Sequence, residues 1–277
     1  MAADRPVGPM QHLVTWAMLL LLLAIVLVPY AYAVVTGFKP PNDIYEVSWW
    51  PSEFSLDAWH EVFGVYGFQW ALWNSFVAGV GSAVLSILIA VPGAYIFARK
   101  EFRFREIFFY MIVGTLVFPF ILLIVPVTIT WIDLGLFNTF PGLWLAFQIF
   151  AVPYSMWILR GYFARIPRHL EEAAQVYGCT QFQAFYRVIV PLAKPVIVSV
   201  LFLSFLQGWS DFLFSNMLTT GDGPRTAAVA IYTSSSGGER VEWAPLMVMT
   251  LLAGIPPVIL YMLAQRSLSK TFAGTGH

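Results

Sequence analysis

Long apolar stretches alternate with shorter polar ones along this chain. Six of the apolar stretches are long enough to cross about 30 Å of hydrocarbon at about 1.5 Å per helical residue. The stretches lack the polar faces that the helices of a large soluble bundle present to water. The pattern therefore predicts an all-α integral membrane protein in which residues 1–277 form one transmembrane domain. We place the six spans near 13–35, 73–98, 107–130, 141–160, 194–215 and 244–265.

The composition agrees with a chain whose surface faces lipid. Hydrophobic residues make up 59% of the chain and charged residues only 11%, whereas a soluble domain carries about 25% charged residues. The 15 basic and 15 acidic residues cancel, which argues against a nucleic-acid partner. One cysteine and four scattered histidines offer no metal-ligand spacing, so we expect no metal site.

The first apolar stretch also has features of a signal peptide. Arg5 precedes it, and Ala31-Tyr32-Ala33 is a small-residue pattern typical of a cleavage site. A signal peptide has an apolar region of only about 7–15 residues, whereas Leu13 to Val35 covers 23 residues. We therefore expect this stretch to be retained as a membrane span.

The distribution of basic residues predicts the orientation in the membrane, because cytoplasmic segments carry an excess of Lys and Arg. If the N-terminus is inside, the external segments 36–72 and 216–243 contain only three basic residues, namely Lys39, Arg225 and Arg240. We therefore expect both termini, and the long loop 161–193, to be cytoplasmic. The cytoplasmic segments then hold the other 12 of the 15 basic residues: Arg5, Arg99, Lys100, Arg103, Arg105, Arg160, Arg165, Arg168, Arg187, Lys194, Arg266 and Lys270.

Two patterns within the spans concern packing. Small residues recur every fourth position in the second span and predict close approach of a neighbouring helix, although such a face also suits a solute path. Prolines inside the spans are tolerated in membrane bundles because neighbouring groups satisfy the freed carbonyls. The small residues are Ala78, Ser82, Ser86, Ala90 and Ala94, and the prolines are Pro29, Pro92, Pro119, Pro126, Pro153, Pro256 and Pro257.

The loop 161–193 is polar, yet its residues predict two short helices. Pro167 suits a first helical position, and Glu171 and Glu172 fall in the first turn, where acids stabilise the helix dipole. The run 168–177 stops at Gly178, a suitable C-terminal cap. Thr180 and Gln183 have the spacing of a capping box, which predicts a second helix that continues to Pro191.

The spacing within this loop resembles the signature of binding-protein-dependent ABC importer permeases. That family has Glu-Ala-Ala, a glycine four positions after the last alanine, and then Ile-x-Leu-Pro. This chain has Glu172-Ala173-Ala174, Gly178 and Pro191 in the same spacing. It departs from the pattern at four positions: Val188 and Val190 replace isoleucine and leucine, Tyr177 stands where aspartate is frequent, and Cys179 stands where alanine is frequent.

The resemblance extends to the last two spans. Residues 208–212, Gly-Trp-Ser-Asp-Phe, are similar to a Trp-Asn-Asp/Glu segment of carbohydrate permeases, with Ser210 in place of asparagine. The last span resembles the second permease of maltose-type heterodimers at Trp243, Leu246-Met247, Ile255-Pro256 and Gln265-Arg266. The resemblance implies the type I ABC importer permease fold, in a bacterial or archaeal cell (inner) membrane.

The chain contains no G-x-x-x-x-G-K-[ST] loop for binding ATP and neither of the hydrolase patterns G-x-S-x-G and H-E-x-x-H. We therefore expect a transport subunit that is not an enzyme and binds no cofactor. The resemblance implies a second permease subunit, a dimer of ATP-binding-cassette ATPases that holds ATP and magnesium, and an external solute-binding protein. It also implies that the ATPase is coupled through Glu171, Glu172, Ala173, Ala174, Gly178 and Pro191.

Four residues are candidates for the solute path. Asp211 is the only carboxylate in the predicted spans, and such groups mark a pathway or structure a helix end. Trp209 and Gln207 add an aromatic face and a hydrogen-bonding group that suit a sugar, and Asn74 is a weaker candidate. We expect import of a sugar or related polar solute. Glycerol phosphate, polyamine or peptide import remains open, and a secondary transporter would need paired repeats that this chain lacks.

Overall fold

A computed structural model describes residues 9–40, 43, 48–221, 223–236 and 242–273. That part of the chain contains helices and no strand, which confirms the all-α prediction. The chain divides into two compact units, residues 1–67 with 233–254 and residues 68–232 with 255–277. The prediction of orientation also involves five charged residues that lie outside the described part of the chain. They are Arg5 near the N-terminus and, in the predicted external segments, Glu46, Asp222, Glu239 and Arg240.

The first unit contains α1 (Pro9–Thr36), α2 (Asp57–Gly64) and the beginning of α13 (Trp243–Ala273). Helix α1 covers the first predicted span, and its apolar side chains are exposed along its length. Lys39, just after α1, is buried, and its Nζ donates a 2.6 Å hydrogen bond to the carbonyl of Ser48. This contact ties the chain that leaves α1 to the segment that precedes α2.

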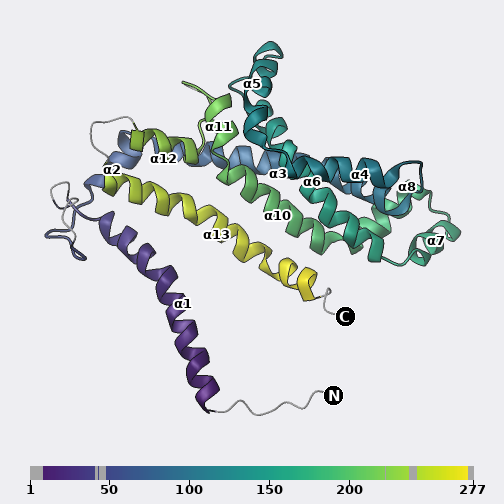
Figure 1. Cartoon of the computed structure of the whole chain (residues 1–277), viewed down its shortest axis with the longest axis horizontal. Coiled ribbons are helices and arrows are strands. Elements are labelled where there is room, and N and C mark those ends of the chain that lie inside the picture. Colours follow the sequence, from purple (N-terminus) through teal and green to yellow (C-terminus); the bar gives the residue numbers. More distant parts are fainter. Residues whose placement is uncertain (1–8, 41–42, 44–47, 222, 237–241, 274–277) are drawn as a thin grey trace. The chain divides into compact units, whose positions relative to one another are not determined.

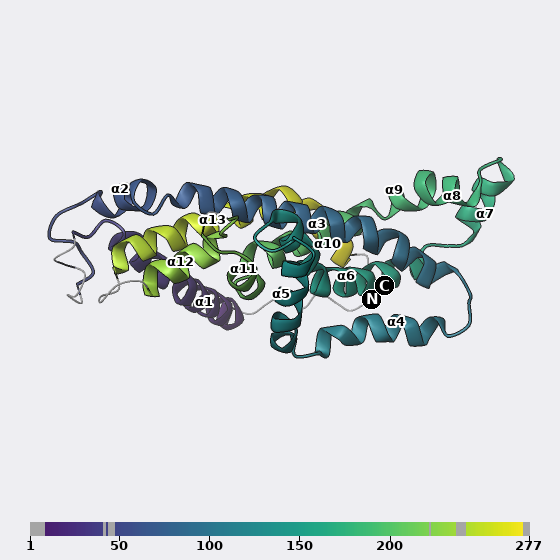
Figure 2. The same ribbon diagram turned by 90° about the horizontal axis from the view of Figure 1, so that it is seen from above.

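Three helices form the core of the second unit: α3 (Phe68–Arg99), α6 (Phe140–Arg165) and α10 (Lys194–Ser210). They run side by side in Figures 1 and 2. The predicted small-residue stripe of α3 lies at their contact, which confirms its packing role. All five of its side chains, Ala78, Ser82, Ser86, Ala90 and Ala94, are 0% exposed.

Hydroxyl groups join the same three helices inside this core. The Oγ atom of Ser155 on α6 lies 3.0 Å from that of Ser86 on α3 and 3.2 Å from that of Ser204 on α10. Short side chains let the backbones approach, and the hydroxyls satisfy one another away from water. Gly79 and Gly208 extend the contact, since a Cβ atom at Gly208 would lie 3.2 Å from the Cα of Gly79.

The third predicted span is broken rather than continuous. It consists of α4 (Arg105–Gly114), η2 (Thr115–Val117), η3 (Phe120–Leu123) and α5 (Ile124–Asp133), and its halves meet at 94°. Figure 2 shows the bend. Phe118 is extended, with ψ 133°, because a residue before proline avoids the helical region. The prediction that Pro119 lies inside a continuous helix is therefore wrong.

The fifth predicted span is also modified at both ends. Helix α8 (Gln181–Ala184), a π-helical segment η4 (Phe185–Ile189) and α9 (Val190–Leu192) precede α10 and meet it at 75°. Pro191 has no N–H to continue the helical ladder, which accounts for the irregular turn beside it. Helix α10 ends at Ser210 instead of residue 215, and α11 (Leu213–Leu218) and α12 (Ala227–Ser236) follow.

Four described helices are long and apolar enough to cross a membrane, and six spans result when each bent pair counts as one. The six-span prediction agrees with the second count. Prolines lie inside the long helices as predicted at Pro29, Pro92, Pro153, Pro256 and Pro257. The cytoplasmic position of the termini stays a prediction from the charges.

Candidate functional site

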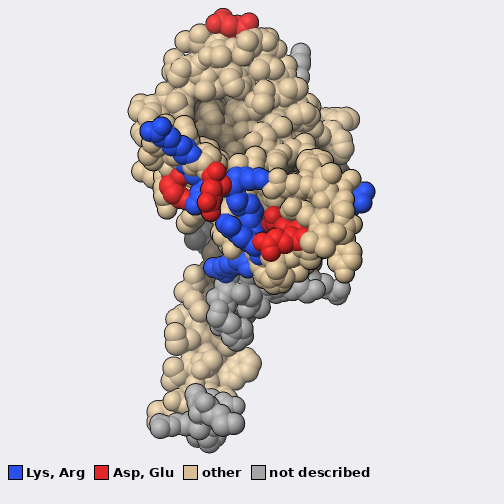
Figure 3. Space-filling model, turned by 90° about the vertical axis from the view of Figure 1, so that its right-hand side faces the viewer, with Lys and Arg blue, Asp and Glu red and all other residues tan. Residues whose placement is uncertain are grey.

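The segment between the fourth and fifth spans folds into a short helix at one end of the second unit. Helix α6 ends at Arg165, and α7 (His169–Val176) follows after a three-residue connection. Figures 1 and 2 show α7 and α8 beyond the ends of the core helices. Figure 3, which views this end directly, shows Lys, Arg, Asp and Glu side chains gathered on it. The loop that the sequence analysis predicted to couple to the ATPase therefore lies at a charged end of the second unit.

The C-terminus of α7 has the hydrogen bonds of a Schellman motif. The N–H of Gly178 donates to the carbonyl of Gln175 at 2.9 Å, and that of Cys179 donates to Ala174 at 3.0 Å. Gly178 has φ +89°, a conformation that a side chain disfavours. The predicted glycine cap is confirmed, and it turns the chain sharply between the two loop helices.

The start of the second loop helix also agrees with the prediction. The Thr180 hydroxyl accepts a hydrogen bond from the N–H of Gln183 at 3.2 Å, and the Gln183 side chain accepts one from the N–H of Thr180 at 2.9 Å. These two bonds form the capping box expected from the sequence. Helix α7, however, begins at His169, so the prediction of Pro167 as a first helical residue is wrong by two positions.

The two adjacent glutamates of α7 have different surroundings. Glu171 is buried against the bundle, with its Oε1 atom 2.9 Å from Nε of Arg99 and its Oε2 atom accepting a 3.0 Å hydrogen bond from the hydroxyl of Tyr95. Both partners belong to the last two turns of α3. Arg99 also donates to the carbonyl of Ile166. Glu171 therefore holds α7 to the rest of its own chain.

Glu172, the next residue of α7, is exposed. Ala173 is exposed beside it, Val176 is 85% exposed and Tyr177 is 90% exposed. Phe182, on α8, is 70% exposed. A carboxylate among exposed apolar side chains is a composition suited to a protein partner. Of the remaining predicted coupling residues, Ala174 is half-buried and Pro191 is exposed.

A second group of charges lies at the same end of the unit. Glu106, in the first turn of α4, contacts Arg160 of α6, and Nη2 of Arg105 lies 2.9 Å from the same carboxylate oxygen. The Arg160 guanidinium is 4.0 Å from the centroid of the Phe109 ring. These contacts fix the start of the broken span against α6.

The candidate solute residue Asp211 lies just beyond α10, where it ends the helix. Its backbone is extended, with ψ 123°. Its Oδ1 atom accepts hydrogen bonds from the N–H of Ser215 at 2.9 Å and from the Ser215 hydroxyl at 3.1 Å. The prediction that Asp211 lies within a span helix is therefore wrong. Its contacts correspond to the alternative, in which the carboxylate structures a helix end by starting α11.

The other three candidates lie nearby in the chain or on α3. Trp209 is buried, 6% exposed, and its ring lies 5.6 Å from that of Phe205. The Oε1 atom of Gln207 is buried and accepts no hydrogen bond from the described part of the chain. The side-chain amide of Asn74 donates to the carbonyl of Arg225 at 3.1 Å. Gln207 is thus the candidate with an unused polar atom.

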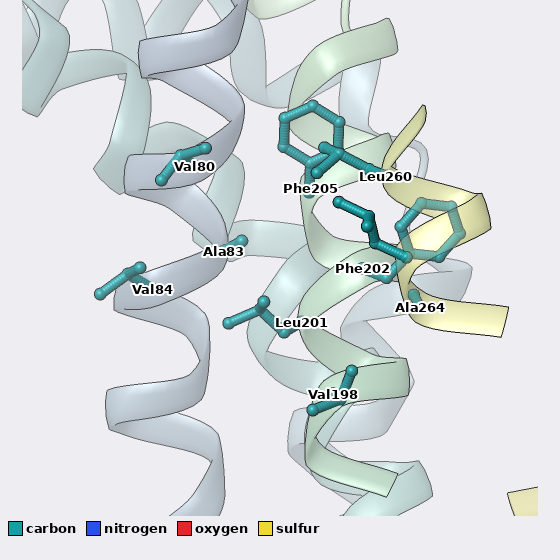
Figure 4. A pocket seen from close by; sticks show the side chains of 10 residues that line it. Val80, Ala83, Val84, Val198, Leu201, Phe202, Phe205, Leu260 and Ala264 are labelled. Atoms are coloured by element: carbon teal, nitrogen blue, oxygen red, sulfur yellow. The ribbon is translucent and has the colours of Figure 1, made fainter. Parts of the chain in front are cut away.

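A cavity of about 250 Å³ lies among α3, α10 and the part of α13 after residue 254. Figure 4 shows its lining side chains, all of them apolar, and none of the four solute candidates is among them. Without a hydrogen-bonding group, this cavity is unsuited to a polar solute. Its lining comprises Val80, Ala83, Val84, Val198, Leu201, Phe202, Phe205, Leu260, Leu263 and Ala264.

The external segments named in the sequence analysis meet in the first unit. The hydroxyl of Tyr66 donates to Oε2 of Glu242 at 3.4 Å. Burial and the neighbouring Glu242 carboxylate raise the pKa of Glu61 to about 7. Two acids that repel each other when ionised share one tyrosine here, so this contact is strongest while Glu61 is protonated.

Within the described residues, no group of three or more His, Cys, Asp or Glu side chains is placed to hold a metal ion. Sequence reasoning missed Arg99 and Tyr95, because their partner Glu171 lies 76 positions from Tyr95 and no short motif joins them. The one available signal was the charge of Arg99 at the end of a predicted span.

Comparison with known proteins gives one consistent answer. Residues 84–273 match the family described as binding-protein-dependent transport system inner membrane component. The diacetylchitobiose uptake system permease protein of Streptomyces coelicolor is 31% identical over 97% of this chain and 88% of that protein. The trehalose transport system permease protein of Mycobacterium tuberculosis is 32% identical over 91% of this chain and 92% of that protein.

Among solved structures, a chain of a bacterial ABC transporter involved in the import of the acidic polysaccharide alginate has the same fold. The TM-score is 0.79 at 20% identity, and the match covers 96% of this chain and 99% of that chain. The exposed Glu-Ala-Ala helix, the glycine turn and the six apolar segments are thus explained together. This chain belongs to the binding-protein-dependent transport system inner membrane components, the permease subunits of ABC importers.

Proposed function

We propose that this chain forms half of the translocation path of a sugar importer in a bacterial or archaeal cell membrane. It works with a second permease, an ATPase dimer that binds ATP and magnesium, and an external solute-binding protein. Two of its relatives are named for a diacetylchitobiose and a trehalose system, which supports a sugar or related polar solute. The chain itself performs no chemical step and holds no cofactor.

One observation carries the coupling part of this proposal, namely the exposed face of α7. Glu172 stands between the buried side of the helix and the exposed Val176 and Tyr177. In the first turn of a helix a carboxylate is stabilised by the dipole, and in a partner's cleft it would pair with a basic residue. Gly178, with φ +89°, turns the chain directly after this helix. Ala173 leaves room for close approach of the ATPase.

The proposed solute path runs along the end of α10. The unused Oε1 atom of Gln207 supports a contact to a solute hydroxyl, and Trp209 supplies an aromatic face nearby. Asp211 supports the path by accepting the hydrogen bond from Ser215 beyond the end of α10. Asn74 supports it by donating a hydrogen bond to the carbonyl of Arg225. A path between two permeases needs such polar groups on the face turned to the second subunit.

The first experiment purifies the tagged chain from its source membranes in mild detergent. We expect a second permease and an ATPase to co-purify, and the complex to hydrolyse ATP. Addition of the cognate binding protein with diacetylchitobiose, trehalose or glycerol phosphate, tested separately, identifies the solute by stimulated hydrolysis. An isolated chain that recruits no ATPase would contradict the proposal.

The second experiment tests the α7 surface with Glu172→Lys. The substitution reverses the charge in the first turn and costs about 0.3–1 kcal/mol of dipole stabilisation, in addition to the pair across the interface. We expect the ATPase to bind about ten-fold more weakly, equivalent to about 1.4 kcal/mol. Glu101→Lys is the matched control, because Glu101 is an exposed acid at the same end of the unit but outside α7. Equal binding by both variants would contradict the assignment of Glu172.

A further inference from the structure

Helix α7 is attached to the end of α3 by one buried cluster, defined here as the α3–α7 clamp. It consists of Tyr95, Arg99 and Glu171. The side chains of Arg99 and Glu171 are only 6% and 11% exposed. One carboxylate oxygen of Glu171 forms the ion pair and the other accepts the tyrosine hydrogen bond. Each carboxylate oxygen of Glu171 thus lies against a different side chain of α3.

The clamp also reaches the other elements that meet at this end. Arg99 donates to the carbonyl of Ile166, in the connection between α6 and α7. The Tyr95 ring lies 6.1 Å from that of Phe163 on α6 and 4.4 Å from that of Phe185 on η4. Tyr95 therefore contacts both the helix before α7 and the segment after α8. A displacement of α7 has to move these elements or break the clamp.

A second ion pair joins the same two parts of the chain and differs in one respect. Arg168, just before α7, lies 3.8 Å from Glu101, just after α3, and the two side chains are 62% and 80% exposed. Exposed pairs contribute little because water and salt screen them, whereas removing one partner of a buried pair leaves an uncompensated charge. The exposed pair is thus a built-in control for the buried one.

We infer that the α3–α7 clamp is a positioning device that transmits movement of α7 to the core helix α3. Glu171 acts inward on this chain, and Glu172 acts outward on the ATPase. This division of roles rests on the proposed coupling function of α7. It adds one expectation for a variant whose clamp is broken. Such a variant still binds the ATPase, but it transmits the state of the ATPase poorly because α7 then moves without α3.

The experiment uses the whole importer complex in lipid vesicles with its binding protein. Two quantities are measured for Glu171→Gln, an isosteric change that removes the charge. The amount of ATPase bound is expected to stay within about two-fold of the wild type, whereas the binding-protein stimulation of hydrolysis falls at least five-fold. Glu101→Gln, which removes the exposed pair, is expected to leave both quantities within two-fold.

A double-mutant cycle separates the clamp from a general loss of fold. Arg99→Met and Glu171→Gln each leave one buried group unpaired, whereas the double variant removes both charges. We expect the double variant to lose no more stimulation than the worse single variant. Tyr95→Phe keeps the ion pair and removes only the tyrosine hydrogen bond, so its stimulation is expected to fall about three-fold, beyond the two-fold limit of the Glu101→Gln control. This variant tests the clamp if the charge variants fail to assemble.

Three results would overturn the inference: wild-type stimulation in Glu171→Gln, losses that multiply in the double variant, or an equal loss in Glu101→Gln. A wild-type chain that binds no ATPase at all is a different result and contradicts the proposed function. A complex that forms and is insensitive at Glu171 contradicts the clamp alone.

Discussion

The α7 loop and the end of α10 both carry a conspicuous acid beside a break in a helix, yet the two regions are built differently. In the loop, Glu171 is held by two side chains of another helix, Arg99 and Tyr95 of α3. At the end of α10, Asp211 is held by Ser215, four residues along its own chain. The first acid therefore joins two elements, and the second shapes one. Substitutions at the loop should disturb communication between elements, and those at Asp211 should disturb local structure.

The largest expected effect comes from Gly178→Val in the loop. A β-branched residue at φ +89° costs about 1–3 kcal/mol, and relief of this strain would change the angle between α7 and α8. We expect binding-protein-stimulated hydrolysis and import to fall at least ten-fold, whereas solute binding by the free binding protein is unchanged. Gly161→Val is the control, since Gly161 lies within α6 with open space around a Cβ atom. Full activity of the Gly178→Val complex would contradict the proposed coupling role of the loop.

The comparison also explains what sequence could predict. Gly178, Thr180 and Gln183 act on their own neighbours, so their spacing in the chain was enough to predict the caps. The partners of Glu171 depend on how α3 packs against α7, and a single sequence does not show which distant residues are in contact. Helix ends within apolar stretches were harder still. Pro119 breaks one apolar helix and Pro153 lies inside another, because the neighbours of each proline decide whether the freed groups are satisfied.

An intermediate effect is expected from Asp211→Ala at the end of α10. Loss of a side-chain cap costs about 0.5–2 kcal/mol, and the N–H of Ser215 is left without its acceptor. We expect import to fall about three- to ten-fold with little change in ATPase binding. Ser215→Ala keeps the Asp211 contact to the backbone N–H and removes only the hydroxyl contact. If Asp211 acts only on the helix end, Asp211→Asn retains most of the import; if it contacts solute, Asp211→Asn changes the solute concentration that gives half-maximal import.

The smallest expected effect is that of Thr180→Ala, which removes half of the capping box and leaves Gly178 in place. The N–H of Gln183 loses its acceptor, at a cost of about 0.5–2 kcal/mol for the start of α8. This cost falls on the far side of the glycine turn from the clamp, so the contact of Glu171 with Arg99 is untouched. We therefore expect a loss of import of no more than about three-fold, with faster amide hydrogen exchange confined to residues 181–184. Exchange that also rises at residues 169–176 would show that α7 depends on α8 rather than on α3. The loop would then be stabilised by its own neighbours, as the end of α10 is, and the contrast between Glu171 and Asp211 would no longer hold.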